Sequence, residues 1–402
     1  MSSKTIVYSE LRSSKAYYIL LGICAVLVGL GALSFFHLEH QGHHVTGMNN
    51  QIVWGLPHVF AIFLIVAASG ALNISSIGTV FSKTIYQPLG RLSALLAISL
   101  LIGGLAILVL DLGHADRLLV TLTHRNTKSI FAWNIWLYSG FLALGALYLW
   151  TMMDRKVNRF YKYAGFAAFN WRLILTMGTG SIFGFLVARE FYTGAVMAPL
   201  FISMSFSLGL SVYILVLLAS AALGSREVGD LIVNRLRYLL AIFIGAVLFF
   251  ELARHLANLY VTEKQGVEAF ILKDSRYAAL FWVGQIFFGS LLPLFLIFCK
   301  KFVNQRWAVR LAAMLVILGG FVQLYINLIG GQAYPLTLFP NAEVSSSFFD
   351  GEITQYSASI WEWLLGLGGF ALSVLILLIG LQVLRFLPES LADEVIEPLS
   401  QA

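Results

Sequence analysis

Residues 92–110 read LSALLAISLLIGGLAILVL, an apolar run between Arg91 and Asp111 without a single charged side chain. A helix that spans a membrane needs about 20 such residues. Similar runs recur along the whole chain, in which 59% of the residues are hydrophobic and 11% are charged. A soluble domain carries about 25% charged residues. The sequence therefore predicts an all-α polytopic membrane protein that folds in a lipid bilayer.

Apolar stretches long enough to span a membrane occur about ten times. They cover 17–36, 54–81, 91–112, 130–152, 170–190, 196–223, 237–260, 278–299, 308–330 and 358–386. Lys and Arg are enriched on the cytoplasmic side of membrane proteins. With the N-terminus inside, most of the 26 Lys and Arg residues fall in inner segments. Both termini are therefore predicted to be cytoplasmic, as an even number of spans requires.

Short patterns recur in the same order in two halves of the chain, as they do in internal repeats. Asp111 near the end of the third span matches Glu251 near the end of the seventh, the spacing of Trp133 and Gly140 matches that of Trp282 and Gly289, and Gly184–Phe185 matches Gly320–Phe321. The repeat predicts two parallel four-helix bundles with two peripheral helices. The predicted division is an N-terminal tail (1–16), a peripheral helix and outer loop (17–53), a first bundle (54–190), a second bundle (191–330), an outer loop and peripheral helix (331–386) and a C-terminal tail (387–402).

Polar side chains gather at the helix ends that this topology places at the outer surface. Ionisable groups within a membrane are costly and indicate function. The first bundle and the residues directly after it contribute Trp54, His58, Asp111, His114, Arg117, Trp133, Asn134 and Tyr192. We expect Asp111 and His114 to share one helix face that Arg117 continues, because residues three apart on a helix are neighbours.

A quinone would suit such a cluster, because it needs an apolar slot with a few polar groups for its two oxygens. Oxidation of a quinol also needs proton acceptors, and a histidine near a carboxylate supplies one. We therefore predict that His58, Asp111 and His114 bind and deprotonate quinol. The predicted binding residues are Trp54, Arg117, Trp133, Asn134 and Tyr192. A structural ion pair between Asp111 and Arg117 is the alternative interpretation.

Other cofactors fit the sequence less well. Cys24 and Cys299 are too few for an intrinsic iron–sulfur cluster, which uses about four thiolates. A haem b held by His58, His114 or His255 would need two facing histidines at one depth, and it ranks below quinone. The outer loop 37–53 contains His37, His40, His43 and His44, which can bind metal. A solvated polar loop is the favoured interpretation, so no metal site is predicted, and the net charge of +6 indicates no nucleic-acid partner.

Several stretches resemble the NrfD/PsrC-like family of quinone-interacting membrane subunits, closest to its ten-helix, DsrP/HmcC/HybB-like branch. They are Val53–Leu56 (VWGL), Leu110–Gly113 (LDLG), Ser129–Asn134 (SIFAWN), Phe281–Trp282, Gly330–Gln332 with Pro335, and Trp361–Trp363. The matches run from about residue 50 to residue 365, and their order and spacing carry the resemblance. The chain departs from the family pattern at His114, where many relatives have Arg, and at Trp133 and Asn134, where several have an acid.

The resemblance implies two four-helix bundles and a menaquinone or ubiquinone site in the first bundle near the outer face. It implies a ferredoxin-like iron–sulfur subunit on that face, further oxidoreductase subunits, and a bacterial or archaeal cytoplasmic membrane. It also makes Glu251 and His255 candidates for a proton path in the second bundle. The departures from the pattern leave the primary proton acceptor open.

Two other functions are compatible with a polytopic chain. A secondary transporter places its polar site near the membrane midplane, often at broken helices. Here the polar residues gather at outer helix ends, and helix-breaking proline is scarce: Pro57 and Pro199 open expected helices, and Pro293 alone is internal to one. A purely structural anchor for a complex would bind no quinone. The sequence favours a quinone-binding subunit of a respiratory or sulfur-metabolism oxidoreductase over both.

Overall fold

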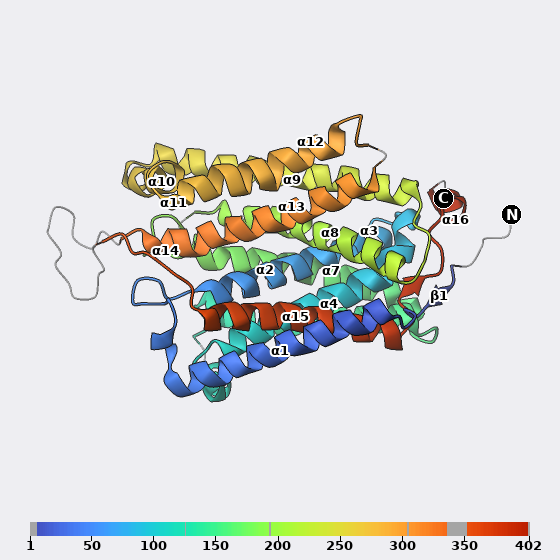
Figure 1. Cartoon of the computed structure of the whole chain (residues 1–402), viewed down its shortest axis with the longest axis horizontal. Helices are drawn as coiled ribbons and strands as arrows, with labels where there is room; N and C mark the ends of the chain where they lie inside the picture. The colour runs from blue at the N-terminus through green and yellow to red at the C-terminus, as the bar shows by residue number, and fades with distance from the viewer. Residues whose placement is uncertain (1–5, 125, 193, 304, 336–351, 401–402) are drawn as a thin grey trace.

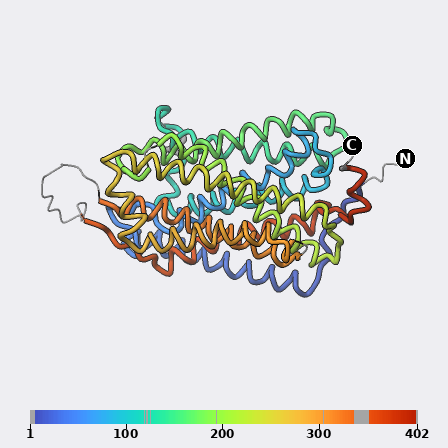
Figure 2. The backbone as a smooth tube through the Cα atoms, turned by 90° about the horizontal axis from the view of Figure 1, so that it is seen from above, coloured from blue at the N-terminus to red at the C-terminus, as the bar shows by residue number. Residues whose placement is uncertain are grey.

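The computed structural model describes residues 6–124, 126–192, 194–303, 305–335 and 352–400. Their helices run along one common axis, which is horizontal in Figure 1, and the view from above in Figure 2 shows the same alignment. Such a bundle satisfies its backbone hydrogen bonds within each helix, as a hydrocarbon environment requires. The predicted all-α membrane architecture is confirmed.

Ten long helical segments make up the bundle of described residues. They are α1 (Lys15–Gln41), α2 and α3 (Leu56–Ala71, Asn73–Thr79), η2 and α4 (Thr84–Leu89, Gly90–Leu110), α6 (Ile130–Met153), α7 (Tyr161–Gly184), α8 (Met197–Leu223), α9 (Asp230–Tyr260), α11 with η6 and α12 (Arg276–Ala279, Leu280–Leu291, Leu292–Phe298), α13 with η7 and α14 (Arg306–Tyr325, Ile326–Gly330, Gly331–Ala333), and α15 (Ile360–Val383). The shorter elements are β1 (Tyr8–Ser9), η1 (His43–Val45), η3 (Ala115–Arg117), α5 (Leu118–Thr123), η4 (Asn158–Phe160), η5 (Thr262–Lys264), α10 (Gln265–Leu272), β2 (Leu387–Pro388) and α16 (Asp393–Ser400).

Within the described ranges, 9 of the long segments are both long and apolar enough to cross a membrane. The remaining one, α7, is a 24-residue helix that includes Lys162, Asn170 and Arg172 and is therefore less apolar. It packs on both α6 and α8, and it lies along the bundle axis beside α8 (Figure 1). Its neighbours shield the Arg172 side chain, which is fully buried.

The two ends of the chain meet at one end of the bundle. Tyr8 and Ser9 of β1 pair antiparallel with Pro388 and Leu387 of β2. Both termini lie at this end in Figure 1, so the bundle contains an even number of passes. We call this the inner end and the opposite end the outer end, after the predicted orientation. The outer end holds the start of α2 and the last turns of α4 and α9.

Small residues allow the helices to pack closely. The most extensive contact joins α1 to α15, and α15 also packs on α4 and α2. At the centre, α2 and α8 cross so closely that a Cβ on Gly70 would meet the Ser205 carbonyl and a Cβ on Gly209 the backbone of Gly70. Glycine allows such an approach between membrane helices. The division into two four-helix bundles remains a prediction.

Several helix boundaries differ from those expected, among them the start of the third span at Thr84 instead of 91 and the end of the first at Gln41 instead of 36. The fifth segment, α7, covers Tyr161–Gly184 instead of 170–190, because the aromatic and charged stretch at 161–172 continues the helix. The seventh, α9, begins at Asp230 instead of 237. The third ends at Leu110, because Asp111 caps α4 and Gly113 takes a φ of 73° that reverses the chain. Most of the outer loop expected at 331–357, namely 336–351, lies outside the described residues, as do 1–5 and 401–402 of the two tails.

Candidate functional site

Asp111 is the centre of a polar cluster at the outer end of the bundle. It lies directly after α4, as the residue that caps the end of this helix. The residue is only 6% exposed. A buried carboxylate is costly unless partners compensate its charge, so the contacts of Asp111 decide what it can do.

Two histidines supply that compensation. His58, in the first turn of α2, places Nδ1 3.0 Å from Asp111 Oδ2. His43, in η1 of the outer loop, places Nε2 3.6 Å from Asp111 Oδ1. Burial works to raise the pKa of Asp111, but the contacts with His43 and His58 outweigh burial and lower that pKa. The contact with Asp111 raises the pKa of His43 above its usual value, against the opposing effect of burial.

The two oxygens of Asp111 have unused hydrogen-bonding capacity. Within the part of the chain that the structure describes, the contacts of these oxygens with His58 and His43 are ion-pair contacts at 3.0 and 3.6 Å, and no further hydrogen-bond donor reaches them. A carboxylate oxygen has two lone pairs, so each can accept one more hydrogen bond. A hydroxyl group of a bound ligand could form hydrogen bonds with both the Asp111 carboxylate and the His58 imidazole. The donor set therefore fits a ligand that presents hydroxyl or carbonyl oxygens.

The outer loop that carries His43 is fixed by hydrogen bonds to distant helices. The fully buried Glu362, in the first turn of α15, accepts hydrogen bonds from the backbone N–H of Gly47 (2.8 Å) and from the Tyr356 hydroxyl (2.5 Å). That hydroxyl accepts in turn from the N–H of Leu56, the first residue of α2. Gln332 Oε1 accepts from the N–H groups of Val53 and Trp54. These bonds place η1 and the start of α2, and with them both histidines.

An aromatic group adjoins the start of α2. The Trp54 ring lies 6.0 Å from Phe131, 5.7 Å from Phe183 and 6.3 Å from Tyr192, measured between centroids. Tyr192 is buried and donates its hydroxyl to the Leu328 carbonyl at 2.7 Å. Phe131 also lines an open groove of about 520 Å³ between the start of α6 and the end of α7. Phe131 thus contacts Trp54 and also lines this groove.

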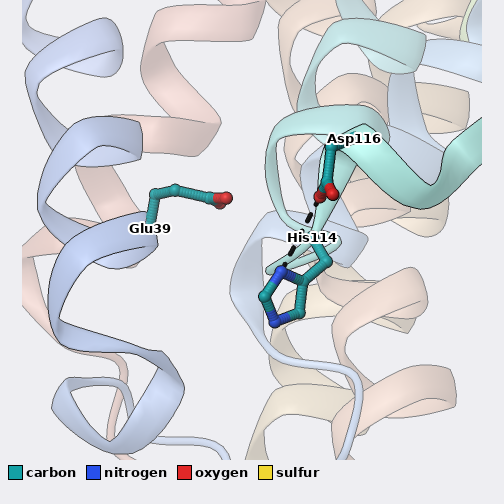
Figure 3. A group of neighbouring side chains, drawn as sticks. All are labelled: Glu39, His114 and Asp116. Carbon is teal, nitrogen blue, oxygen red and sulfur yellow. Dashed lines mark ion pairs between the residues drawn. The ribbon is translucent and has the colours of Figure 1, made fainter.

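His114 and Arg117 lie elsewhere than expected. The prediction that Asp111, His114 and Arg117 share a helix face is wrong, because α4 has already ended and Gly113 turns the chain. His114 is exposed, with its Nδ1 3.7 Å from the exposed Asp116, and Arg117 is exposed on η3. Glu39 of α1 faces this pair (Figure 3), and the ligand atoms of Glu39, His114 and Asp116 lie within 4.8 Å of one another.

The two expected residues at the start of α6 point in different directions. Trp133 is 54% exposed and donates its ring N–H to the Thr127 carbonyl at 2.8 Å. Asn134 is buried and donates to the Ile130 carbonyl at 2.9 Å and to the Gly178 carbonyl of α7 at 3.4 Å. Trp133 lines the groove described above, whereas Asn134 ties α6 to α7. His58 and Asp111 are thus together, and Trp54 and Tyr192 form the aromatic group next to them.

A second cluster surrounds Glu251 and His255 near the outer end of α9. His255 Nδ1 lies 2.6 Å from Glu268 Oε2, and His255 Nε2 lies 3.2 Å from Glu251 Oε1. Arg254 pairs with Glu251 at 2.9 Å. All four residues are buried, and we call them the Glu251–Glu268 network. Its geometry brings together the two residues expected to form a proton path and adds a carboxylate from α10.

Two residues of these clusters do not follow from the sequence pattern. His43 belongs to a histidine tract whose polar surroundings favour a solvated loop, yet it contacts the buried Asp111. Gly113, two positions after Asp111, is the sequence feature that indicates a turn of the chain at this point. Glu268 lies 13 residues after His255 in a connection whose length and polarity give no indication of burial.

Replacing Gly113 with alanine is expected to disturb the Asp111 cluster. A φ of 73° costs a non-glycine residue about 1–2 kcal/mol, and the new Cβ would lie 2.8 Å from His43 Cε1. We expect the free energy of unfolding to fall by about that amount and His43 to move away from Asp111. Thermal unfolding in detergent measures the first effect. Gly29→Ala on α1, where a Cβ meets no atom within 4 Å, is the matched control; equal stability of both variants would contradict the assignment.

Comparison with known proteins identifies the family of this chain. The chain is 26% identical to the Hdr-like menaquinol oxidoreductase integral membrane subunit of Archaeoglobus fulgidus, over 95% of this chain and 96% of that protein. It is 24% identical to a subunit of the selenate reductase of Mesobacillus selenatarsenatis, over 92% and 93% of the two chains. The family model described as polysulphide reductase, NrfD matches residues 44–335, a range that includes His58, Asp111 and the Glu251–Glu268 network. This chain therefore belongs to the polysulphide reductase NrfD family.

Proposed function

We propose that this protein is the quinone-binding membrane subunit of a multi-subunit oxidoreductase, and that His58, Asp111 and His43 form its quinone site. The observation that carries the proposal is the buried Asp111 carboxylate between two histidines, with hydrogen-bonding capacity to spare. Family membership and the name of the archaeal relative, a menaquinol oxidoreductase subunit, support it. Menaquinone is therefore the first quinone to test, with ubiquinone as the alternative.

The site residues suit proton transfer at a quinol. A bound quinol supplies two electrons and two protons. Asp111, which the contacts with His43 and His58 keep ionised, accepts the first proton from a ligand hydroxyl and, after releasing it, accepts the second. His58 Nδ1 orients the ligand oxygen. His43, with 33% of its side chain exposed, passes the proton to water at the outer end. Reversal of these transfers would serve quinone reduction.

The open groove beside Phe131 suits the apolar tail. It is lined by Ile130, Phe131, Trp133, Ile182, Phe185, Leu186, Val187 and Ala188 together with Lys128 and Ser129. Trp54 contacts Phe131 of this groove and lies four residues before His58 in the chain, just ahead of α2. A ligand with its tail in the groove and its head at Asp111 would pass the aromatic group. Trp54, Trp133 and Tyr192 are therefore proposed as contacts of the ligand, and His114, Arg117 and Asn134 as residues around the site.

Electrons would leave or enter through a partner. Among the described residues Cys24 is buried and Cys299 lies at the opposite, inner end of the helix that contains Trp282, so the two thiols are not adjacent in the chain or in the fold. We propose a ferredoxin-like iron–sulfur subunit at the outer end, next to His43, and further oxidoreductase subunits beyond it. The names of both relatives, each a subunit, support an assembly of several chains. A bacterial or archaeal cytoplasmic membrane with both termini inside is the proposed location.

The function can be tested in the purified complex. We expect it to contain bound quinone and to oxidise an added quinol, and we expect quinone-site inhibitors to block that reaction. A complex without quinone that ignores such inhibitors would show that the chain is a structural anchor. Substrate counterflow into liposomes without any redox partner would show that it is a transporter.

Filling the groove should weaken binding of long-tailed quinols. Ala188→Trp would place an indole in the groove without touching Asp111. We expect a several-fold rise in KM for a long-tailed quinol with kcat unchanged, since the lost contacts are equal in the ground and transition states. A short-tailed analogue should be unaffected. Ala25→Trp on the exposed face of α1 is the control, and an equal rise in KM for both tail lengths would contradict this groove as the tail site.

A further inference from the structure

The Glu251–Glu268 network is electrically balanced only if His255 carries two protons. Both ring nitrogens of His255 face carboxylate oxygens, at 2.6 Å from Glu268 and 3.2 Å from Glu251. A carboxylate only accepts hydrogen bonds when ionised, so Nδ1 needs an N–H. Nε2 lies 3.2 Å from Glu251 and 3.3 Å from Arg254 Nη2, and it donates to Glu251 when His255 is doubly protonated. The network then holds two anions, Glu251 and Glu268, and two cations, Arg254 and the His255 imidazolium. A buried group of this kind is stable when its charges cancel and its atoms are paired.

The network continues to the outer surface through α9 and η5. Glu268 Oε1 accepts a hydrogen bond from Asn258 Nδ2 at 2.7 Å. Asn258 Oδ1 accepts from Lys264 Nζ at 3.3 Å, and Lys264 is half-exposed. Glu268 is thus separated from the outer aqueous phase by one amide and one ammonium group.

Toward the middle of the bundle the network ends at a small cavity. Gln285 and Gln323 donate to the two oxygens of Glu251 at 3.0 Å each. Both glutamines line a cavity of about 20 Å³ together with Ser207 and Ser290, and Gln285 Oε1 is buried without a partner among the described atoms. A polar cavity of this size holds one water molecule. That water would complete the hydrogen bonding of Gln285.

The inner half of the same helices offers no continuation. Residues 238–250 of α9 contain no Asp, Glu, His, Lys or Arg, and neither does α8 (Met197–Leu223). The same holds for residues 278–298 and 311–333, all of which are described. The next buried cation on α9 is Arg237, which donates to the Val303 carbonyl near the inner end. A proton on the network therefore has titratable neighbours in the outward direction alone.

We propose that the Glu251–Glu268 network is a proton-storing site that exchanges protons with the outer compartment and does not conduct them across the membrane. Release begins when the Nδ1 proton of His255 moves to Glu268 Oε2. Asn258 and Lys264 only donate toward Glu268 along this chain, so Glu268 passes the proton to a water molecule that enters when the contact between Asn258 and Lys264 opens. His255 keeps its Nε2 proton, and the network is left with one net negative charge. Uptake reverses the same transfers. No other bond is formed or broken.

The charged groups that face His255 are few. They are Glu251 and Arg254 on α9, Glu268 on α10 and, through Asn258, Lys264 on η5; η6 and α13 present the neutral Gln285 and Gln323. The Phe191 ring covers Arg254 at 4.5 Å, and Tyr192, the next residue, belongs to the aromatic group beside the quinone site. That the Glu251–Glu268 network buffers protons released at Asp111 rests on the proposed function. That the network stores a proton does not rest on it.

The test measures protonation directly, without quinol. The complete complex is reconstituted in one orientation in proton-tight liposomes, and infrared difference spectra record carboxylate and imidazole bands after the pH is stepped on one side. We expect a band change when the pH of the compartment at the α10 end is stepped. Glu268→Gln keeps a hydrogen-bond acceptor for His255 and Asn258 and should abolish the change. Asn258→Leu, which keeps both carboxylates, should slow the change at least tenfold.

Glu263→Gln, the same substitution at an exposed position of η5, is the matched control and should behave like the unaltered protein. Asp111→Asn should show the same band change as the unaltered protein. A failure of the quinone proposal and a failure of this one are therefore distinguishable. An equally fast response to a pH step at the inner end would overturn the proposal, because protons would then cross the membrane. A folded Glu268→Gln variant that shows the same band change as the unaltered protein would overturn it as well.

Discussion

Replacing Asp111 with asparagine is expected to reduce quinol-linked electron transfer by at least about 100-fold, because a positioned proton acceptor contributes a factor of about 10²–10⁴. Asparagine has the size and shape of aspartate and can still contact His58 and His43, so the variant should assemble with its partners. It cannot accept a proton from a ligand hydroxyl at neutral pH. The rate of partner reduction after mixing with quinol measures the effect.

Asp116→Asn is the matched control for this substitution. Asp116 is an exposed acid five positions further on, with His114 as its neighbour, and it lies outside the Asp111 cluster. We expect its rate to equal that of the unaltered protein. Full activity of Asp111→Asn would remove Asp111 from the reaction. A large loss in Asp116→Asn would show that the exposed His114 surface, not the buried cluster, handles the proton.

Arg254→Leu is expected to lower the free energy of unfolding by about 3–5 kcal/mol, the usual cost of removing one partner of a buried ion pair. Arg254 is 4% exposed and pairs with Glu251 at 2.9 Å. Without it, two carboxylates would face one imidazolium in a site that water does not reach. Chemical unfolding of the detergent-solubilised protein, followed by tryptophan fluorescence, measures the loss.

A second substitution should recover most of that stability. In the double variant Arg254→Leu with Glu251→Gln, Glu268 and His255 remain as one anion and one cation, so the charges cancel again. The amide oxygen can still accept one of the two hydrogen bonds that Gln285 and Gln323 donate to Glu251. A double variant that is less stable than Arg254→Leu alone would show that charge balance does not stabilise the network.

The all-α membrane architecture could be predicted from the sequence because the lipid bilayer imposes a simple rule on every span. Every span must be apolar over about 20 residues and must satisfy its own backbone, so span number and order can be deduced from composition. The pairing of His58 with Asp111 was also deducible, since the topology places the start of the second span and the end of the third at one surface. Likewise, Glu251 and His255 are four apart on one helix and meet as expected.

The remaining site residues depend on turns and connections, where hydropathy carries no information. The positive φ at Gly113 ends the helical register, moves His114 to the surface and allows His43 to approach Asp111. Glu268 is buried because α10 folds back on α9, and a polar connection of that length has many conformations. Glu362 acts through Gly47, which is far from it in sequence, and through Tyr356, which lies six residues before it. Such contacts follow from the three-dimensional fold alone.

The most direct test of the quinone site is photo-crosslinking of an azido-quinone to the purified complex in liposomes, with the labelled peptides identified by mass spectrometry. The account predicts label in the segments that contain His43, Trp54 to His58, and Leu112 to Gly113, and loss of that label when an excess of the parent quinone is present. Label confined to other helices, or label at these segments that the parent quinone does not displace, would contradict a quinone site at Asp111.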